Sequence, residues 1–197
     1  MDLEIIALLT ASRIGSNYHL GGARLTSSLY GAGAEYALHS LLILASRQEP
    51  VSVRDLAKYQ QLPERFLAKV FSRLKASQIV VGTEGISGGF RLARPAGEIP
   101  VLQVLEAVDP DRALFACAEI RRNCALYEEQ PPEWAVSGPC RIHAFMLEAE
   151  QKLKEALASK TIADLVCELS CKVPKPFSEE TAQWFQDQRR SRRNLAQ

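Results

Sequence analysis

Residues 52–78 contain two helical patterns separated by a helix break at Leu62-Pro63. The first segment is short, and Ser52 is a suitable N-cap for it. The second begins with proline, which the first helical turn tolerates because the missing N–H has no helical acceptor there. Its apolar side chains recur every three or four positions, at Phe66, Leu67, Val70, Phe71 and Leu74. A short helix, a tight turn and a longer amphipathic helix predict a helix-turn-helix, although an ordinary helical hairpin has the same pattern.

A glycine-rich hairpin follows the second helical segment directly. Residues 79–95, IVVGTEGISGGFRLARP, contain two short apolar segments around a turn with Gly85, Gly88 and Gly89. Glycine permits the positive φ angles and close backbone approaches that such turns require. A β-hairpin in this place is typical of a DNA-binding wing, so the sequence favours DNA binding over the ordinary helical hairpin. We therefore expect a mainly α-helical fold with a small β wing.

Basic side chains lie where such a fold meets DNA. We expect Arg65 and Lys69 to approach base edges in the major groove. Phosphates, which position a protein without specifying sequence, are the expected targets of the other basic residues of the helix and the wing. These residues are Arg73, Lys75, Arg91 and Arg94.

The overall charge limits the kind of nucleic-acid contact. The chain has 24 Lys and Arg against 23 Asp and Glu, a net charge of +1. Such a balance argues against coating of nucleic acid over the whole surface, so any contact must be a local patch. The apolar start MDLEIIALLT is acidic and too short to span a bilayer. We expect a cytoplasmic protein with no membrane partner.

Residues 109–141 form an irregular segment that a simple DNA-binding domain does not need. Prolines and glycines forbid a continuous helix there, and the segment contains Cys117, Cys124 and Cys140. A long connection without secondary structure is uncommon unless something organises it, and soft thiolate ligands on a metal centre can do so. A zinc site that adds His143 is an alternative, as are plain buried cysteines. Cys167 and Cys171 are expected to pack in a helix.

Residues 142–171 are expected to form a long helix and a short closing helix. Apolar positions from Ile142 to Leu157 recur at alternating intervals of four and three, which is typical of a coiled-coil face. A second copy of the chain is the expected partner for this face, and packing onto the chain's own domain is the alternative. A twofold homodimer would read a palindromic site on double-stranded DNA. Residues 172–197 are interpreted as a C-terminal tail that ends in a solvated basic run.

The N-terminal part divides near residue 30. Residues 1–29 lack a sustained period and are expected to be a disordered extension, and residues 30–108 to form the winged helix-turn-helix domain. A first helix is expected from about Gly31, with Glu35 in its N-terminal turn, where a carboxylate interacts favourably with the helix dipole.

Several segments in the same order resemble the Rrf-type winged-helix regulators, a family that includes IscR, NsrR and RsrR. The similar segments are GAEYALHSLLILAS, LAKYQQLPERFLAKVFSRL, GGFRLARP, VLQVLEAVD, the cysteine loop and TIADL. They extend from about Leu29 to Val166, and FACAEIRR and KTIADLV are closest to the RsrR branch. The resemblance implies a homodimeric transcription regulator whose loop cysteines hold an iron–sulfur cluster.

The resemblance also implies a ligand set. Carried onto this chain, the ligands are Cys117, Cys124, Cys140 and, from the first helix of the partner subunit, Glu35. A two-iron two-sulfur cluster is favoured and a four-iron four-sulfur cluster is the alternative. The branch's histidine position corresponds to Gln60, a poor iron ligand, so Cys124 takes its place with His39 and His143 in reserve.

Two other functions fit parts of the sequence. A regulator without iron would use the same thiols for a disulfide or for zinc and would keep the DNA-binding half. A thiol redox enzyme would use Cys117 or Cys140 beside Arg121 and Arg122, but no paired base, phosphate loop or deaminase motif accompanies these cysteines. For a regulator with a cluster, the expected signal is redox state, nitric oxide or iron status.

Overall fold

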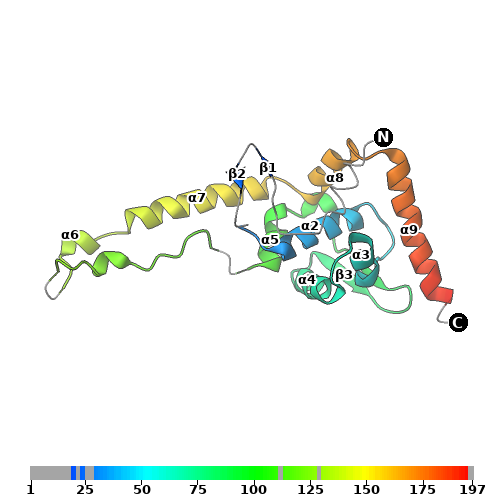
Figure 1. Ribbon diagram of the computed structural model, residues 1–197, viewed down its shortest axis with the longest axis horizontal. Helices are drawn as coiled ribbons and strands as arrows, with labels where there is room; N and C mark the ends of the chain where they lie inside the picture. Colours follow the sequence, from blue (N-terminus) through cyan, green and yellow to red (C-terminus); the bar gives the residue numbers. More distant parts are fainter. Residues whose placement is uncertain (1–18, 21–22, 25–28, 111–112, 128–129, 195–197) are drawn as a thin grey trace.

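The computed structural model describes residues 19–20, 23–24, 29–110, 113–127 and 130–194 (Figure 1). The elements in this part of the chain are β1 (His19–Leu20), β2 (Ala23–Arg24), α2 (Ala32–Ala45), α3 (Val53–Gln60), α4 (Glu64–Ala76), β3 (Val80–Thr83), β4 (Gly89–Leu92), η1 (Ala96–Glu98), α5 (Val101–Val108), η2 (Ile120–Arg122), α6 (Glu133–Val136), α7 (Arg141–Ala158), α8 (Ile162–Ser170) and α9 (Lys175–Asn194). The expectation of a disordered extension falls mostly on residues outside this part. The prediction of a mainly helical chain with a small β wing is confirmed.

Helix α2 lies at the centre of the domain and contacts α4, α5, α8 and β4. Its buried face carries Ala37, Leu41 and Leu44, which pack in one core with Leu67 and Phe71 of α4. Leu41 and Phe71 are both fully buried. Burial of each such side chain contributes about 1.5–3 kcal/mol to stability, so apolar packing on α2 fixes how α4 is oriented.

The helix-turn-helix forms as its capping residues predict. Ser52 caps α3 by accepting a hydrogen bond from the Asp55 N–H at 3.1 Å. The turn then closes at Gln61, which adopts the left-handed conformation, and Pro63 precedes α4. The predicted second helix is therefore confirmed.

The wing is the antiparallel pair β3 and β4, with Val80 opposite Leu92 and Thr83 opposite Gly89. Its base is fastened to the domain because Val51 and Phe90 exchange backbone hydrogen bonds of 2.9 and 2.8 Å. Gly89 is required at this contact, since a Cβ atom there would lie 2.4 Å from the carbonyl carbon of Val51. The wing is thus held beside the start of α3.

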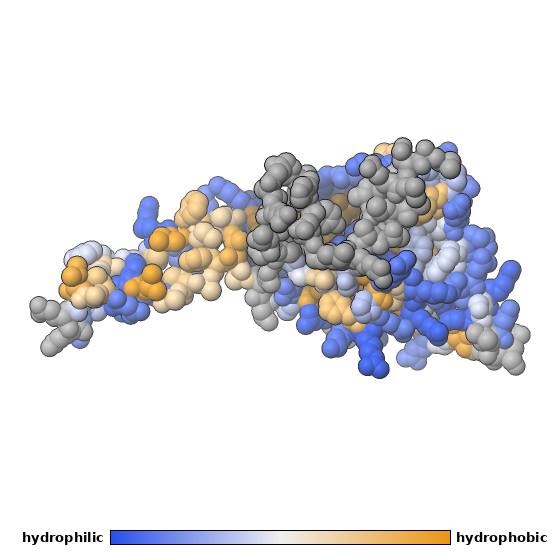
Figure 2. Space-filling view, in the orientation of Figure 1, coloured by the Kyte–Doolittle hydropathy of each residue, from blue (hydrophilic) through white to orange (hydrophobic). Residues whose placement is uncertain are grey.

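Helix α7 extends away from the domain (Figure 1). None of its residues is buried, and Ile142 and Phe145 are each 66% exposed. At the C-terminal end of α7, Leu157 packs against Ala34, Val101 and Leu105. This end therefore follows the alternative expectation, in which the helix packs on its own domain. Thr161 then caps α8, and backbone hydrogen bonds fasten the segments around Pro100 and Thr161 to each other. Hydrophobic surface follows the rest of α7 (Figure 2).

The interpretation of residues 172–197 as a tail is wrong for residues 175–194, which form α9. Phe185 of this helix is 6% exposed and belongs to the main core, with Trp184 packed beside it. Their rings lie 5.0 and 5.2 Å from that of Tyr59 on α3. The basic run therefore ends a docked helix, because two adjacent aromatic side chains supply enough apolar surface to hold it.

Phe185→Ala should lower the free energy of unfolding by about 3 kcal/mol, because it leaves a cavity between α9 and α3. Urea denaturation measures the change, with Glu179→Ala, an exposed position on the same helix, as the control. Equal stability of the two variants would show that α9 is not docked.

Candidate functional site

The outward face of α4 is basic. Because seven residues make almost two helical turns, Arg65 and Ser72 lie on one face, and Lys69 lies between them. All three are exposed, whereas Leu67 and Phe71 are buried on the opposite side. The exposed face thus presents two cations and a hydroxyl, groups that suit the edges of bases in a major groove.

Arg73 lies on a different side of α4, seven residues after Phe66. The Phe66 ring contacts the Tyr36 ring edge to face at 5.5 Å, and Arg73 donates a hydrogen bond to the carbonyl of Val108 at the end of α5. A cation at the C-terminal end of a helix is favourable. Arg73 therefore links α4 to α5, and part of its donor capacity is already used within the chain.

The basic residues of the wing also differ. Arg91 is exposed on β4, and Lys75 is exposed at the end of α4 near Gly82. Arg94 is half-buried and donates to the Glu98 carbonyl at 3.0 Å and to the Gln103 side-chain oxygen. Arg91 and Lys75 are thus free to meet phosphates, whereas Arg94 holds the base of the wing against α5.

The cysteine loop folds back along the first half of α7. The N–H of Leu114 donates to Glu150 at 3.3 Å, and the ring of Phe115 lies 6.2 Å from that of His143. Farther along the loop, near the N-terminal end of α7, Arg121 donates a hydrogen bond to the Gly138 carbonyl at 3.3 Å. These contacts hold the loop alongside α7, so that the segment around Arg121 lies near Gly138 and the start of that helix (Figure 1).

Arg121 lies close to two of the three loop cysteines. Its pKa lies above the ordinary value, first because it hydrogen-bonds to Glu119 at 2.5 Å and also because negative charge on Cys140 and Cys117 lies nearby. Both thiols are half-buried. A cation near two cysteines can balance the negative charge of an anionic centre that they hold.

The other expected ligands are distributed over the molecule. Cys124 is exposed in a turn of the same loop, and His143 lies beside that loop on α7. Glu35 and His39 lie on α2, in the domain from which α7 extends. Among the described residues, no three His, Cys, Asp or Glu side chains gather as a metal site. Of the expected set, Cys117 and Cys140 are thus the two thiols whose electrostatic influence reaches the same arginine, Arg121.

Three further polar positions bear on the sequence expectations. Gln60 is buried and accepts a hydrogen bond from Ser40 at 3.1 Å, so it joins α3 to α2. Cys167 and Cys171 are exposed, which contradicts their expected packing, because the buried residue of α8 is Ile162.

Within the described ranges, no helix is long and apolar enough to cross a membrane.

Sequence reasoning missed the basic residues that α9 brings to the helix-turn-helix. Arg192 pairs with Asp55, and Arg193 donates to Ser87 in the turn of the wing at 2.7 Å. The available signal was the pair Trp184-Phe185 one to two turns before the basic run, which predicts a docked helix rather than a solvated tail.

Comparison with known proteins gives a consistent assignment. The family model described as "Rrf2: Iron-dependent Transcriptional regulator" matches residues 30–168. The HTH-type transcriptional regulator IscR of Xenorhabdus nematophila is 30% identical over 146 residues, which cover 73% of this chain and 79% of that protein. The resemblance found in the sequence is confirmed.

Solved structures agree on the fold. The structure of T. potens IscR has a TM-score of 0.54 and 18% identity, and covers 80% of this chain and 97% of its own. CymR, described as the global cysteine regulator of B. subtilis, has a TM-score of 0.53 and 20% identity, and covers 70% of this chain and 95% of its own.

Arg94→Ala should lower the free energy of unfolding by about 1–2 kcal/mol, because two charge-assisted hydrogen bonds at the base of the wing are lost. Arg91→Ala should change it by less than about 0.5 kcal/mol, since Arg91 is exposed. Urea denaturation of both variants checks the difference, and equal effects would contradict the role of Arg94 as a brace.

Proposed function

Because the chain belongs to the Rrf2 family of transcriptional regulators, we propose that it binds a palindromic operator on double-stranded DNA as a homodimer and senses its signal through an iron–sulfur cluster. The exposed basic face of α4 beside the wing is the observation that supports DNA binding. A regulator acts where its DNA lies, so we place the protein in the cytoplasm. The family assignment favours regulation over the thiol redox enzyme.

In this proposal α4 enters the major groove with Arg65 and Lys69 toward base edges. Lys75 and Arg91 contact phosphates beside the groove, which fixes register and orientation. Arg73 and Arg94 lie close enough to this surface to add long-range attraction for phosphates, although they donate to Val108, Glu98 and Gln103. Arg65 and Lys69 therefore determine specificity, and the other cations mainly affinity.

Helix α7 supports the proposal of a homodimer. Ile142, Phe145 and Leu147 are 66%, 66% and 53% exposed on a helix that extends from the domain. A second copy of α7 can cover this apolar surface, and a twofold axis between the copies would place two α4 helices on successive half-sites.

For the sensor we propose Cys117, Cys124 and Cys140 as cluster ligands and Glu35 of the partner subunit as the fourth. Support comes from the two thiols beside Arg121, whose cation suits an anionic cluster, and from the third cysteine on the same loop. Thiolates are the ligands that iron–sulfur clusters take, and a two-iron two-sulfur cluster fits this mixed ligand set. When bound, the cluster would supply the reactivity toward redox state, nitric oxide or iron supply.

A cluster-free thiol regulator is the second candidate. Cys117 and Cys140 both lie on the cysteine loop near Arg121, and two thiols on one loop can form a disulfide by thiol–disulfide exchange. A zinc site with His143 is a further variant of this candidate. All these variants keep the DNA-binding half unchanged.

Arg65→Ala should weaken binding to a duplex that the protein selects from a random pool by about 1–3 kcal/mol and relax the preference at one base pair of each half-site. Fluorescence anisotropy at fixed salt measures this change. Unchanged affinity and preference would show that α4 does not dock through this face.

Protein purified without oxygen should show the charge-transfer absorption of an iron–sulfur cluster, and Cys117→Ser and Cys140→Ser should each abolish it. Cys167→Ser, at an exposed cysteine outside the loop, is the control and should retain the spectrum. Glu35→Ala should keep part of the cluster, because carboxylate is the most labile of the proposed ligands. A colourless wild-type protein with bound zinc or a disulfide would instead support the second candidate.

A further inference from the structure

Helix α9 lies outside the matched family segment, residues 30–168, yet it is firmly docked on the DNA-binding domain. Besides the ring contacts of Trp184 and Phe185, the Tyr59 hydroxyl hydrogen-bonds to Thr181 at 2.9 Å. The guanidinium of Arg47 lies 4.2 Å from the centre of the Phe185 ring. These contacts fix where the end of α9 lies.

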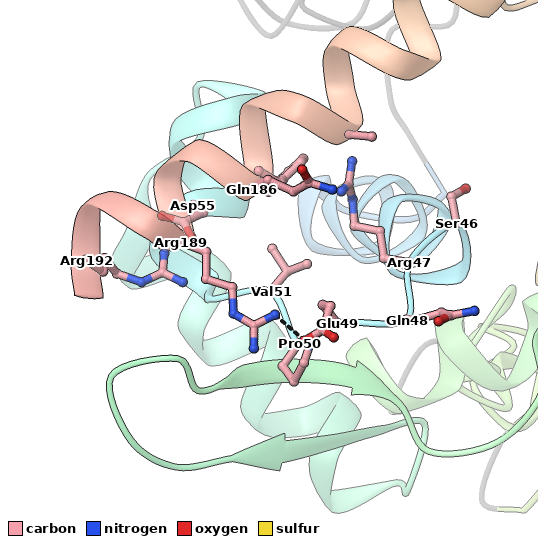
Figure 3. Close-up of a pocket in the computed structure, with 12 residues that line it drawn as sticks. Ser46, Arg47, Gln48, Glu49, Pro50, Val51, Asp55, Gln186, Arg189 and Arg192 are labelled. Carbon is pink, nitrogen blue, oxygen red and sulfur yellow. Dashed lines mark hydrogen bonds and ion pairs between the residues drawn. The ribbon is translucent and has the colours of Figure 1, made fainter. Parts of the chain in front are cut away.

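The last six residues of α9, 189–194, carry four arginines, and three of them contact the helix-turn-helix domain or its wing. Arg189 pairs with Glu49 and Arg192 with Asp55, and all four side chains line a cavity of about 260 Å³ beneath α9 (Figure 3). Arg192 also donates to the Ser52 side chain at 3.1 Å. The end of α9 thus lies against the first turn of α3.

Arg193 extends this contact to the wing. Its Nε donates to the Ser87 hydroxyl at 2.7 Å, in the turn between β3 and β4. The start of α3 and the turn of the wing are therefore connected by one pair of neighbouring arginines on α9.

The local charge favours an anion at this place. Two carboxylates beneath α9, Glu49 and Asp55, are already paired with Arg189 and Arg192, whereas Glu84 in the turn of the wing is exposed. The pKa of Arg192 lies below its ordinary value, mainly because of burial and further because the cation of Arg54 is nearby. Arg54, Arg190 and Arg193 are exposed. An excess of exposed positive charge thus surrounds the start of α3.

This charge lies on the side of the domain that faces DNA in the proposed docking. In helix-turn-helix proteins the first helix of the motif crosses the phosphate backbone while the second enters the major groove. Here α9 runs down beside α3 so that its C-terminal end lies near the wing (Figure 1), and hydrophilic surface continues from α4 to that end (Figure 2).

We propose that the C-terminal end of α9 is a third DNA-binding element, in which Arg190 and Arg193 contact phosphates outside the segment read by α4. Arg192 acts as a positioning residue, because it neutralises Asp55 and anchors the helix end at Ser52. The inference rests on the proposed docking of α4 and the wing. It predicts a half-site footprint longer than those two elements alone would protect.

The test measures how DNA affinity depends on salt. Each phosphate contact contributes about 0.9 to the slope of log K against log salt concentration, so Arg190→Ala/Arg193→Ala should reduce the magnitude of the slope by about 1.8. The probe is a random-sequence duplex between 50 and 200 mM KCl. A selected duplex should lose affinity by the same factor, because phosphates carry no sequence information.

Lys172→Ala/Lys175→Ala is the matched control. It removes the same charge near the opposite end of α9, where both lysines are exposed, and should leave the slope nearly unchanged. Urea denaturation verifies that both double variants fold. An equal loss of slope in the control would overturn the inference, because overall charge would then explain the effect.

A purely structural role of α9 is distinguished by Ser87→Ala, which removes the hydrogen bond to the wing and keeps the charge of Arg193. Ser87→Ala should keep the wild-type salt slope. A reduction of the slope by about 0.9, the contribution of one phosphate contact, would overturn the inference, because Arg193 would then act only by holding the wing in place. Arg65→Ala separates the two proposals. Altered sequence preference in Arg65→Ala together with an unchanged slope in Arg190→Ala/Arg193→Ala would overturn the role of α9 alone.

Discussion

The packing of α4 on α2 is the interaction on which the rest of the molecule depends. Leu67 and Phe71 are fully buried against the core that Leu41 helps to form, and their burial outweighs any surface ion pair by several-fold. This packing leaves the face of Arg65 and Lys69 toward solvent. The same core holds Val51, whose backbone pairs with Phe90 and fixes the wing beside α3. Apolar burial therefore decides which cations can meet DNA.

The cysteine loop and the DNA-reading helix lie in different parts of one subunit. The loop packs along the first half of α7, and α7 reaches the domain through Leu157 and the paired segments at Pro100 and Thr161. In the described part of the chain, the loop that carries Cys117 and Cys140 lies along α7 and away from α4 (Figure 1). In our account the signal acts on how the two subunits are arranged, since a ligand from α2 of one subunit and thiols of the other would join them. A palindromic operator then responds to the spacing of the two α4 helices.

Much of the fold was predictable because it depends on local signals. Ser52 caps α3 as its sequence context predicts, and the glycines of the wing stand where the chain approaches itself closely. The roles of Arg73 and Arg94 were not predictable. The acceptor of Arg73 lies 35 residues later in the sequence and the Gln103 acceptor of Arg94 nine residues later, and both become neighbours only when α5 packs. The docking of α9 likewise depends on Tyr59, more than 100 residues earlier. Of the candidate site, the sequence predicted that Arg121 lies near Cys117 or Cys140, but not its hydrogen bond to the Gly138 carbonyl, which forms only when the loop folds.

We propose that the state of a cluster held by the loop controls DNA binding through the dimer. The most direct measurement is the affinity for one selected duplex, at fixed salt and without oxygen, of the protein before and after removal of its iron. We expect a change of about 5- to 150-fold, which corresponds to the usual coupling free energy between two sites of about 1–3 kcal/mol. Equal affinity of the two forms, with the dimer intact in both, would contradict it.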